Sequence, residues 1–322
     1  MPTSPRPLNA GLGESFSAAA ARSAGHPKSR LRARDLESPY RGVHRRVSQP
    51  ESHDDEPFAR DRAERTRILR DADAYFQVAP EHAFLAGRSA AAVWRLFCAV
   101  GEELCIGVFA PHRAPRRPGI RGVKVAPHLA SIRVVDGLRV TSPATTWAML
   151  GGELSHRDLV AAGDAIVRIP RGAGGRRHPE EQLATVEQLE AAAVARGRKH
   201  RPALLRALAD IRIGSMSPGE TDYRLAAAAA GLPEPALDQE IRDAAGRLLG
   251  VSEIVYPDYK TVVEIEGDHH RTSRAQWLRD LRKYADYARE GYEVVRLTAR
   301  QGAGAEGATL VREALTRRGW QG

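Results

Sequence analysis

The chain has 322 residues, which is long enough for two or three domains that each bury a core of their own. A content of 42% hydrophobic and 28% charged residues is typical of a folded globular protein and excludes an intrinsically disordered chain. The formal net charge of +9 at pH 7 favours association with a polyanion such as nucleic acid.

Cysteine usage and hydropathy exclude several other classes. The two cysteines, Cys98 and Cys105, form no Cys-x-x-Cys pair, so a zinc finger or ribbon is not expected. No stretch approaches the roughly 18 apolar residues of a transmembrane helix, and the N-terminus lacks the apolar run of a signal peptide. The protein is expected in the cytoplasm, with no membrane partner.

Residues 14–46 are predicted to form a helix-turn-helix-like module. A helix over 16–22 and a Gly-containing turn would precede a second, basic helix over 28–36, and 40–46 would add a small wing strand. Residues 1–50 contain nine basic and three acidic side chains. The alternative is a helical module whose solvated basic face contacts protein. The residues predicted to touch DNA phosphates are Lys28, Arg30, Arg32 and Arg34.

A polar, Pro-punctuated linker leads to a central α/β scaffold over 61–168. A charged helix over 61–76 is followed by strand-like runs over 104–109, 122–125, 131–135 and 138–141, then by helices that begin after Ser142 and at His156. Its histidines are scattered, so no catalytic constellation is predicted here.

Residues 40–44, 137–143 and 159–164 resemble actinobacterial proteins related to abortive-infection antitoxins. The resemblance covers most of 14–168 and rests on structural rather than chemical motifs. It implies a winged-helix module at the N-terminus.

A basic connector with helices is predicted over 169–216, and the main domain boundary is placed there. The last domain, 217–318, is predicted to contain a helix, three strands, a helix, a strand and a helix. Ser217, Pro218 and Glu220 have the spacing of a capping box at its first helix.

Carboxylates interrupt two predicted strands of this domain. Glu264 and Glu266 share one strand face, and Glu253 would come within about 5 Å of Glu264 if the hairpin register aligned them. Such a pair repels unless a cation or a proton intervenes, and Mg²⁺ binds through one or two carboxylates with phosphate and water. The alternative is an exposed strand face whose acids meet solvent.

From about 217 to 300 the chain resembles the very-short-patch-repair-type endonucleases of the restriction-endonuclease-like superfamily, whose motif is PD-(D/E)xK. The matching segments are Tyr256-Pro257, 263–270, Arg279-Asp280 and 291–296. The resemblance implies metal ligands at Glu253 and Glu264 and a supporting role for Glu220.

Two positions depart from this motif. Glu253 stands where Asp is usual, and Glu266 occupies the lysine position, so a positive charge must come from elsewhere. His270, or else His269, is predicted to act as a general base or to polarise the phosphate. Predicted phosphate contacts are Arg279, Lys283 and Arg296.

These observations predict a Mg²⁺-dependent endonuclease acting on DNA, with Mn²⁺ as a substitute metal, no organic cofactor, and a homodimer as one arrangement for double-strand cleavage. The alternative is an antitoxin-type transcriptional regulator that binds DNA and carries an inactive nuclease-like domain. A defence protein acting on RNA is a third interpretation.

Overall fold

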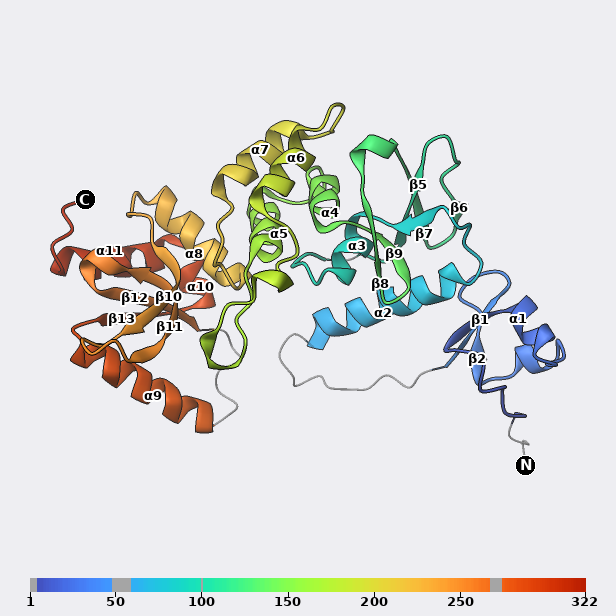
Figure 1. Ribbon diagram of the computed structural model, residues 1–322, viewed down its shortest axis with the longest axis horizontal. Coiled ribbons are helices and arrows are strands. Elements are labelled where there is room, and N and C mark those ends of the chain that lie inside the picture. The colour runs from blue at the N-terminus through green and yellow to red at the C-terminus, as the bar shows by residue number, and fades with distance from the viewer. Residues whose placement is uncertain (1–4, 48–58, 100, 267–273) are drawn as a thin grey trace. The chain divides into compact units, whose positions relative to one another are not determined.

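The structure is a computed structural model that describes residues 5–47, 59–99, 101–266 and 274–322 (Figure 1). It is a mixed α/β protein, as predicted, and its described strands form three sheets. The chain divides into two compact units, residues 1–149 and 150–322. None of the described helices combines the length and the apolar character needed to cross a bilayer.

The first unit begins with a small antiparallel sheet in the order β1-β3-β2. The core beneath it contains Phe16, Ala21 and Leu31. The predicted wing strand is present as its central strand. The elements are β1 (Ser15–Ser17), α1 (Ala18–Ser23), the 3-10 turn η1 (Arg30–Arg32), β2 (Leu36–Glu37) and β3 (Val43–Arg46).

The prediction of a second helix over 28–36 is wrong. Only the single turn η1 forms there, because the Arg30 side chain folds inward instead of following a helix surface. Its guanidinium donates to both carboxylate oxygens of Asp35, at 2.9 and 2.6 Å, and to the backbone oxygen of Arg6. These bonds turn the chain into β2, so residues 28–36, all of which the structure describes, form no recognition helix.

The first unit also contains a mixed sheet in the order β6-β7-β5-β4-β9-β8. Helices α2 and α3 pack on it around Ile68, Leu85 and Ile106. Its elements are α2 (Ala59–Phe76), β4 (Ala83–Leu85), α3 (Gly87–Val93), β5 (Leu104–Phe109), β6 (Arg116–Arg117), β7 (Ile120–Val125), η2 (Pro127–Leu129), β8 (Ile132–Val135), β9 (Leu138–Thr141) and α4 (Pro143–Leu150).

Four helices open the second unit, and helix α5 packs against both α7 and α8. The compact division therefore falls between Met149 and Leu150, whereas the sequence placed the main boundary in 169–216. The bounds are α5 (His156–Val167), η3 (Ala173–Gly175), η4 (Pro179–Glu181), α6 (Val186–Val194), α7 (Arg201–Asp210) and α8 (Pro218–Ala229).

The second unit ends in a sheet of order β10-β11-β12-β13, in which the β12–β13 pair is parallel and the other pairs are antiparallel. Helices α8 and α11 cover one face and α9 the other (Figure 1). The element order is the predicted one with α10 added: β10 (Ala236–Arg242), β11 (Leu248–Tyr256), η5 (Pro257–Tyr259), β12 (Thr261–Glu266), α9 (Arg274–Arg289), β13 (Glu293–Thr298), α10 (Ala299–Gly302) and α11 (Ala305–Arg317).

Candidate functional site

Glu220 lies in the first turn of α8 and is 1% exposed. Ser217 caps the helix by accepting from the Glu220 backbone N–H at 3.3 Å. The reciprocal half of the predicted capping box does not form, because Oε2 of Glu220 accepts from the backbone N–H of Met216 at 2.7 Å instead. Its other oxygen, Oε1, is buried without a hydrogen-bond partner among the described residues.

Burial and two neighbouring acids, Glu253 and Asp164, raise the pKa of Glu220 to about 8. Burial disfavours the ionised form, and the negative charge of Glu253 adds to that effect. The side chains of α8 and β11 therefore bring two carboxyl groups within electrostatic range of each other. An unpartnered, buried carboxylate oxygen beside a second acid is a position that a cation would stabilise.

Glu253 lies where the regular alternation of β11 is interrupted. Val255 packs with Tyr287 of α9, and the Ser252 hydroxyl lies 3.1 Å from the hydroxyl of the same tyrosine, so both face α9 although they are three residues apart. The β11–β12 ladder ends at the pair Ile254–Val263. The predicted register is therefore correct as far as that pair, and Glu253 and Glu264 are the next residues beyond it.

Glu264 accepts two hydrogen bonds on Oε1, from Ser252 Oγ at 3.1 Å and from Lys283 Nζ at 2.9 Å. The glutamate and lysine side chains are 14% and 21% exposed, so the ion pair is largely withdrawn from solvent. Burial opposes the charged ammonium, but the charge and hydrogen bond of Glu264, together with Tyr287 and Glu253, outweigh it, and the net result raises the pKa of Lys283.

Glu266 shares the face of Glu264, as predicted, and forms an ion pair with Arg296 of β13. The Arg296 guanidinium lies 5.5 Å from the ring centroid of Tyr284, and its side chain remains 53% exposed. Four charged groups, Glu264 and Glu266 of β12, Arg296 of β13 and Lys283 of α9, thus line one side of the sheet. Arg296 is accessible to a ligand, whereas Glu266 is already neutralised.

Several predicted site residues cannot be placed in this geometry. His269 and His270 lie outside the described residues, and of Arg279 only the backbone, within α9, is described. Among the described residues no group of three or more His, Cys, Asp or Glu side chains could hold a metal ion. Glu220 and Glu253, which interact electrostatically, are the two carboxylates that would hold a divalent cation, and Mg²⁺ can bind through two carboxylates when phosphate and water complete its shell.

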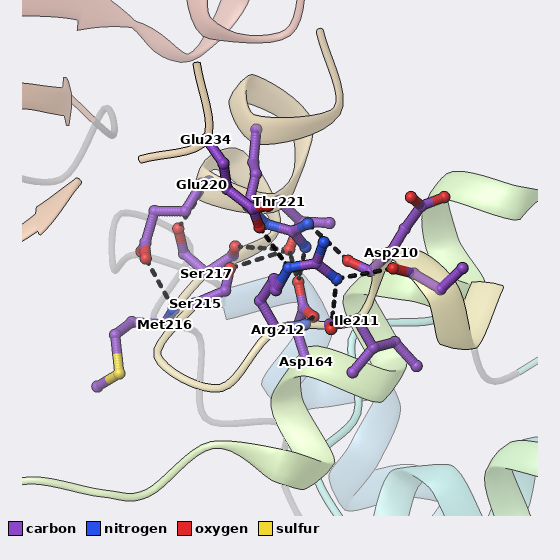
Figure 2. A network of polar contacts seen from close by, with 12 residues as sticks. Asp164, Asp210, Ile211, Arg212, Ser215, Met216, Ser217, Glu220, Thr221 and Glu234 are labelled. Atoms are coloured by element: carbon purple, nitrogen blue, oxygen red, sulfur yellow. Dashed lines mark hydrogen bonds and ion pairs between the residues drawn. The ribbon is translucent and has the colours of Figure 1, made fainter. Parts of the chain in front are cut away.

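A polar network that the sequence did not predict holds the start of α8 (Figure 2). Asp164 of α5 is 1% exposed and accepts from Arg224 Nη2, from Thr221 Oγ1 and from the backbone N–H of Arg212, each at 2.7 Å. Burial raises the pKa of Asp164, and Arg224 partly opposes that shift. The only sequence signal for this network was an acid among the apolar residues of the helix that begins at His156.

The four residues predicted to touch DNA in the N-terminal module separate into two groups. Lys28, Arg32 and Arg34 are exposed. Arg30 is 8% exposed and paired with Asp35, so it is unavailable to a phosphate. The prediction for Arg30 is wrong because a buried guanidinium with a bidentate carboxylate partner serves the fold.

Comparison with known proteins adds no assignment. No family model matches the chain, and no curated protein matches it. Among solved structures the chain is similar to the crystal structure of the RV2827C protein from Mycobacterium tuberculosis, with 15% identity over 72% of this chain and 84% of that one. The TM-score of 0.37 is too low to carry an argument about fold or function.

Proposed function

We propose that the second unit is a metal-dependent endonuclease that hydrolyses phosphodiester bonds in DNA. The observation that supports it is the buried Glu220, whose Oε1 lacks a partner among the described residues and whose pKa is raised by burial and by Glu253. Burying an ionised carboxyl group within the field of a second acid is unfavourable unless a proton or a cation compensates. Mg²⁺ or Mn²⁺ is the cation that this reaction class uses.

Glu220 and Glu253 would hold the metal, which would supply charge neutralisation at the scissile phosphate. Glu253 and Glu264 are the next residues beyond the last β11–β12 pair, but Oε1 of Glu264 accepts a hydrogen bond from Lys283. We therefore assign the cationic role of the motif's missing lysine to Lys283, which arrives from α9 instead of from β12. Its ammonium would donate to the attacking water or to a phosphate oxygen.

In the proposed hydrolysis, water oxygen bonds to phosphorus as the bond from phosphorus to the leaving oxygen breaks. The water proton passes to a base, for which His270 or His269 remains the sequence prediction, and the leaving oxygen takes up a proton. Arg296, exposed on β13 beside Tyr284, would contact a neighbouring phosphate. The products are a phosphate monoester and an alcohol.

Nicking of supercoiled plasmid DNA with Mg²⁺ or Mn²⁺ tests this function. Glu220→Gln, Glu264→Ala and Lys283→Met are each expected to lower the nicking rate at least about 100-fold, because each removes a group that would hold the metal or stabilise charge at the reacting centre. Glu313→Gln and Lys199→Met change the same residue types at exposed positions of the same unit and should leave the rate unchanged. Site variants that nick DNA as fast as these controls would refute the assignment.

One observation favours a second function. Glu264 and Glu266 already have cationic partners in Lys283 and Arg296, which is how an inactive nuclease-like domain would stabilise its former ligands. The chain would then be an antitoxin-type regulator that binds DNA without cutting it. Wild-type protein that binds DNA but cleaves neither duplex, mismatched nor single-stranded DNA, nor RNA, with either metal would support the regulator.

A further inference from the structure

The N-terminal module contains a surface pocket where the recognition helix was expected. Its volume is about 480 Å³, a size typical of small-molecule sites. The pocket lies among α1, η1, β2 and β3. Its lining residues are Ala18, Arg22, Lys28, Leu31, Arg32, Leu36, Ser38 and His44.

The charged side chains at the rim of this pocket are all basic. Arg22, Lys28 and Arg32 are exposed, and none of the lining residues is acidic. The acidic residues of the module are used elsewhere, because each pairs with an arginine outside the pocket. These pairs are Glu14 with Arg70, Asp35 with Arg30, and Glu37 with Arg45. Three cations without a carboxylate partner among the described residues favour an anionic ligand.

The pocket also offers an apolar and aromatic surface. Ala18, Leu31 and Leu36 contribute apolar atoms, and the His44 ring lies beside them. The Nδ1 atom of His44 is within 3.1 Å of Ser38 Oγ, which fixes the ring orientation. Burial lowers the pKa of His44, so its ring is uncharged at neutral pH and can serve as a stacking surface. Charge alone would suffice to bind a simple anion. The apolar and aromatic surface therefore favours a ligand that carries an aromatic group beside its anionic group.

We propose that this pocket binds one nucleotide of a single DNA strand, with its phosphate on Arg22, Lys28 and Arg32 and its base against Leu36 and His44. A basic rim next to a stacking surface is the combination that single-stranded nucleic acid uses. The proposal rests on the proposed function in taking DNA as the polyanion. It goes further than the phosphate contacts predicted for this module, because it adds Arg22 to them, excludes the buried Arg30 and places Arg34 outside the pocket.

Binding of a fluorescent DNA strand of ~10 nucleotides to the full chain, measured by anisotropy in EDTA, tests the pocket. The double variant Arg22→Ala/Arg32→Ala should weaken binding about 25-fold at ~0.1 M salt, because each phosphate contact on a single strand contributes a salt slope of about 0.7. The slope itself should fall by about 1.4.

Arg34→Ala/Arg41→Ala is the matched control. It removes two exposed arginines of the same module that do not line the pocket, so it lowers long-range attraction equally. Both doubles should melt at the wild-type temperature. Equal weakening by the two doubles would refute a defined pocket and leave only a diffuse basic surface.

Two further arms identify the ligand. Arg22→Ala/Arg32→Ala should weaken the binding of duplex DNA less than the binding of the single strand. An equal loss of affinity for both would overturn the assignment of a base to the pocket. Free deoxyadenosine monophosphate should compete only weakly, and competition as tight as the strand would assign the pocket to a free nucleotide instead. Because cleavage cannot occur in EDTA, this binding difference stands or falls separately from the nuclease activity.

Discussion

Glu220 illustrates how much one side chain depends on its surroundings. Its position in the first turn of α8 would suit an ionised cap, yet the backbone of Met216 satisfies only one of its oxygens, and Glu253 repels its charge. The carboxyl group is therefore protonated over much of the neutral pH range. The need for a metal or a proton to compensate the charge of Glu220 therefore comes from the residues around it, not from its position in the sequence.

The stability of the protein should report this protonation. The folded pKa of Glu220, about 8, lies above the value of 4.5 for an unperturbed carboxyl. The stabilisation of the folded state is thus complete below about pH 4.5 and is lost as the pH rises to about 8. Relative to Glu220→Gln, wild-type protein should lose a few kcal/mol of unfolding free energy across this range, as measured by urea unfolding.

Mg²⁺ binding should restore the stability that ionisation of Glu220 removes. At about pH 8, added Mg²⁺ is expected to stabilise the wild type and not Glu220→Gln, because only the ionised carboxylate binds it. Parallel pH profiles for the two proteins would contradict the raised pKa. An equal Mg²⁺ response in both would contradict metal binding at Glu220.

At the scale of elements, α5 and α8 are joined by a buried ion pair. Arg224 Nη2 lies 2.7 Å from Asp164 Oδ2, with side chains 6% and 2% exposed. A second pair links α5 to α7 at the surface, where His156 Nε2 lies 2.8 Å from Asp210 Oδ2 with both side chains more than 40% exposed. The first contact is a buried pair with a permanently charged arginine, and the second is an exposed pair with a histidine that is charged only when protonated.

Asp164→Asn should lower the unfolding free energy by about 3 to 5 kcal/mol, because it leaves the Arg224 charge buried without its counter-charge. Asp210→Asn should change it by at most about 1 kcal/mol, since an exposed pair is screened by water. Chemical unfolding of both variants measures the difference. Similar small losses would mean that Arg224 finds other partners and that the network does not tie α5 to α8.

At the scale of the whole molecule, the chain consists of two compact units with separate hydrophobic cores. Units of this kind open with free energies of their own. Hydrogen exchange read peptide by peptide should therefore show that Asp164→Asn speeds exchange in residues 150–322 and leaves 1–149 at the wild-type rate. Uniform acceleration along the chain would mean that the two units unfold as one.

Local features could be predicted because they depend on neighbours in sequence. Ser217 caps α8 as predicted, and residues 104–109 and 261–266 form strands from their β-branched and aliphatic runs. The face shared by Glu264 and Glu266 follows from strand alternation alone.

The contacts that define the site could not be predicted in the same way. Lys283 reaches Glu264 from 19 residues away, and Arg224 reaches Asp164 from 60 residues away. Arg30 and Arg32 are nearly adjacent, yet one is buried and the other exposed. Spacing within one segment carries no information about which distant segment will supply the partner charge.

The sequence by itself determined the mixed α/β class, the order of elements in residues 217–318 and the acids that interrupt β11 and β12, because propensity, capping and alternation act over a few residues. Only the tertiary structure decided that the second basic helix is a single turn, that Lys283 stands beside Glu264, and that Glu220 is buried next to Glu253. Each of these outcomes depends on desolvation and on a partner brought close by packing, which a linear pattern does not contain.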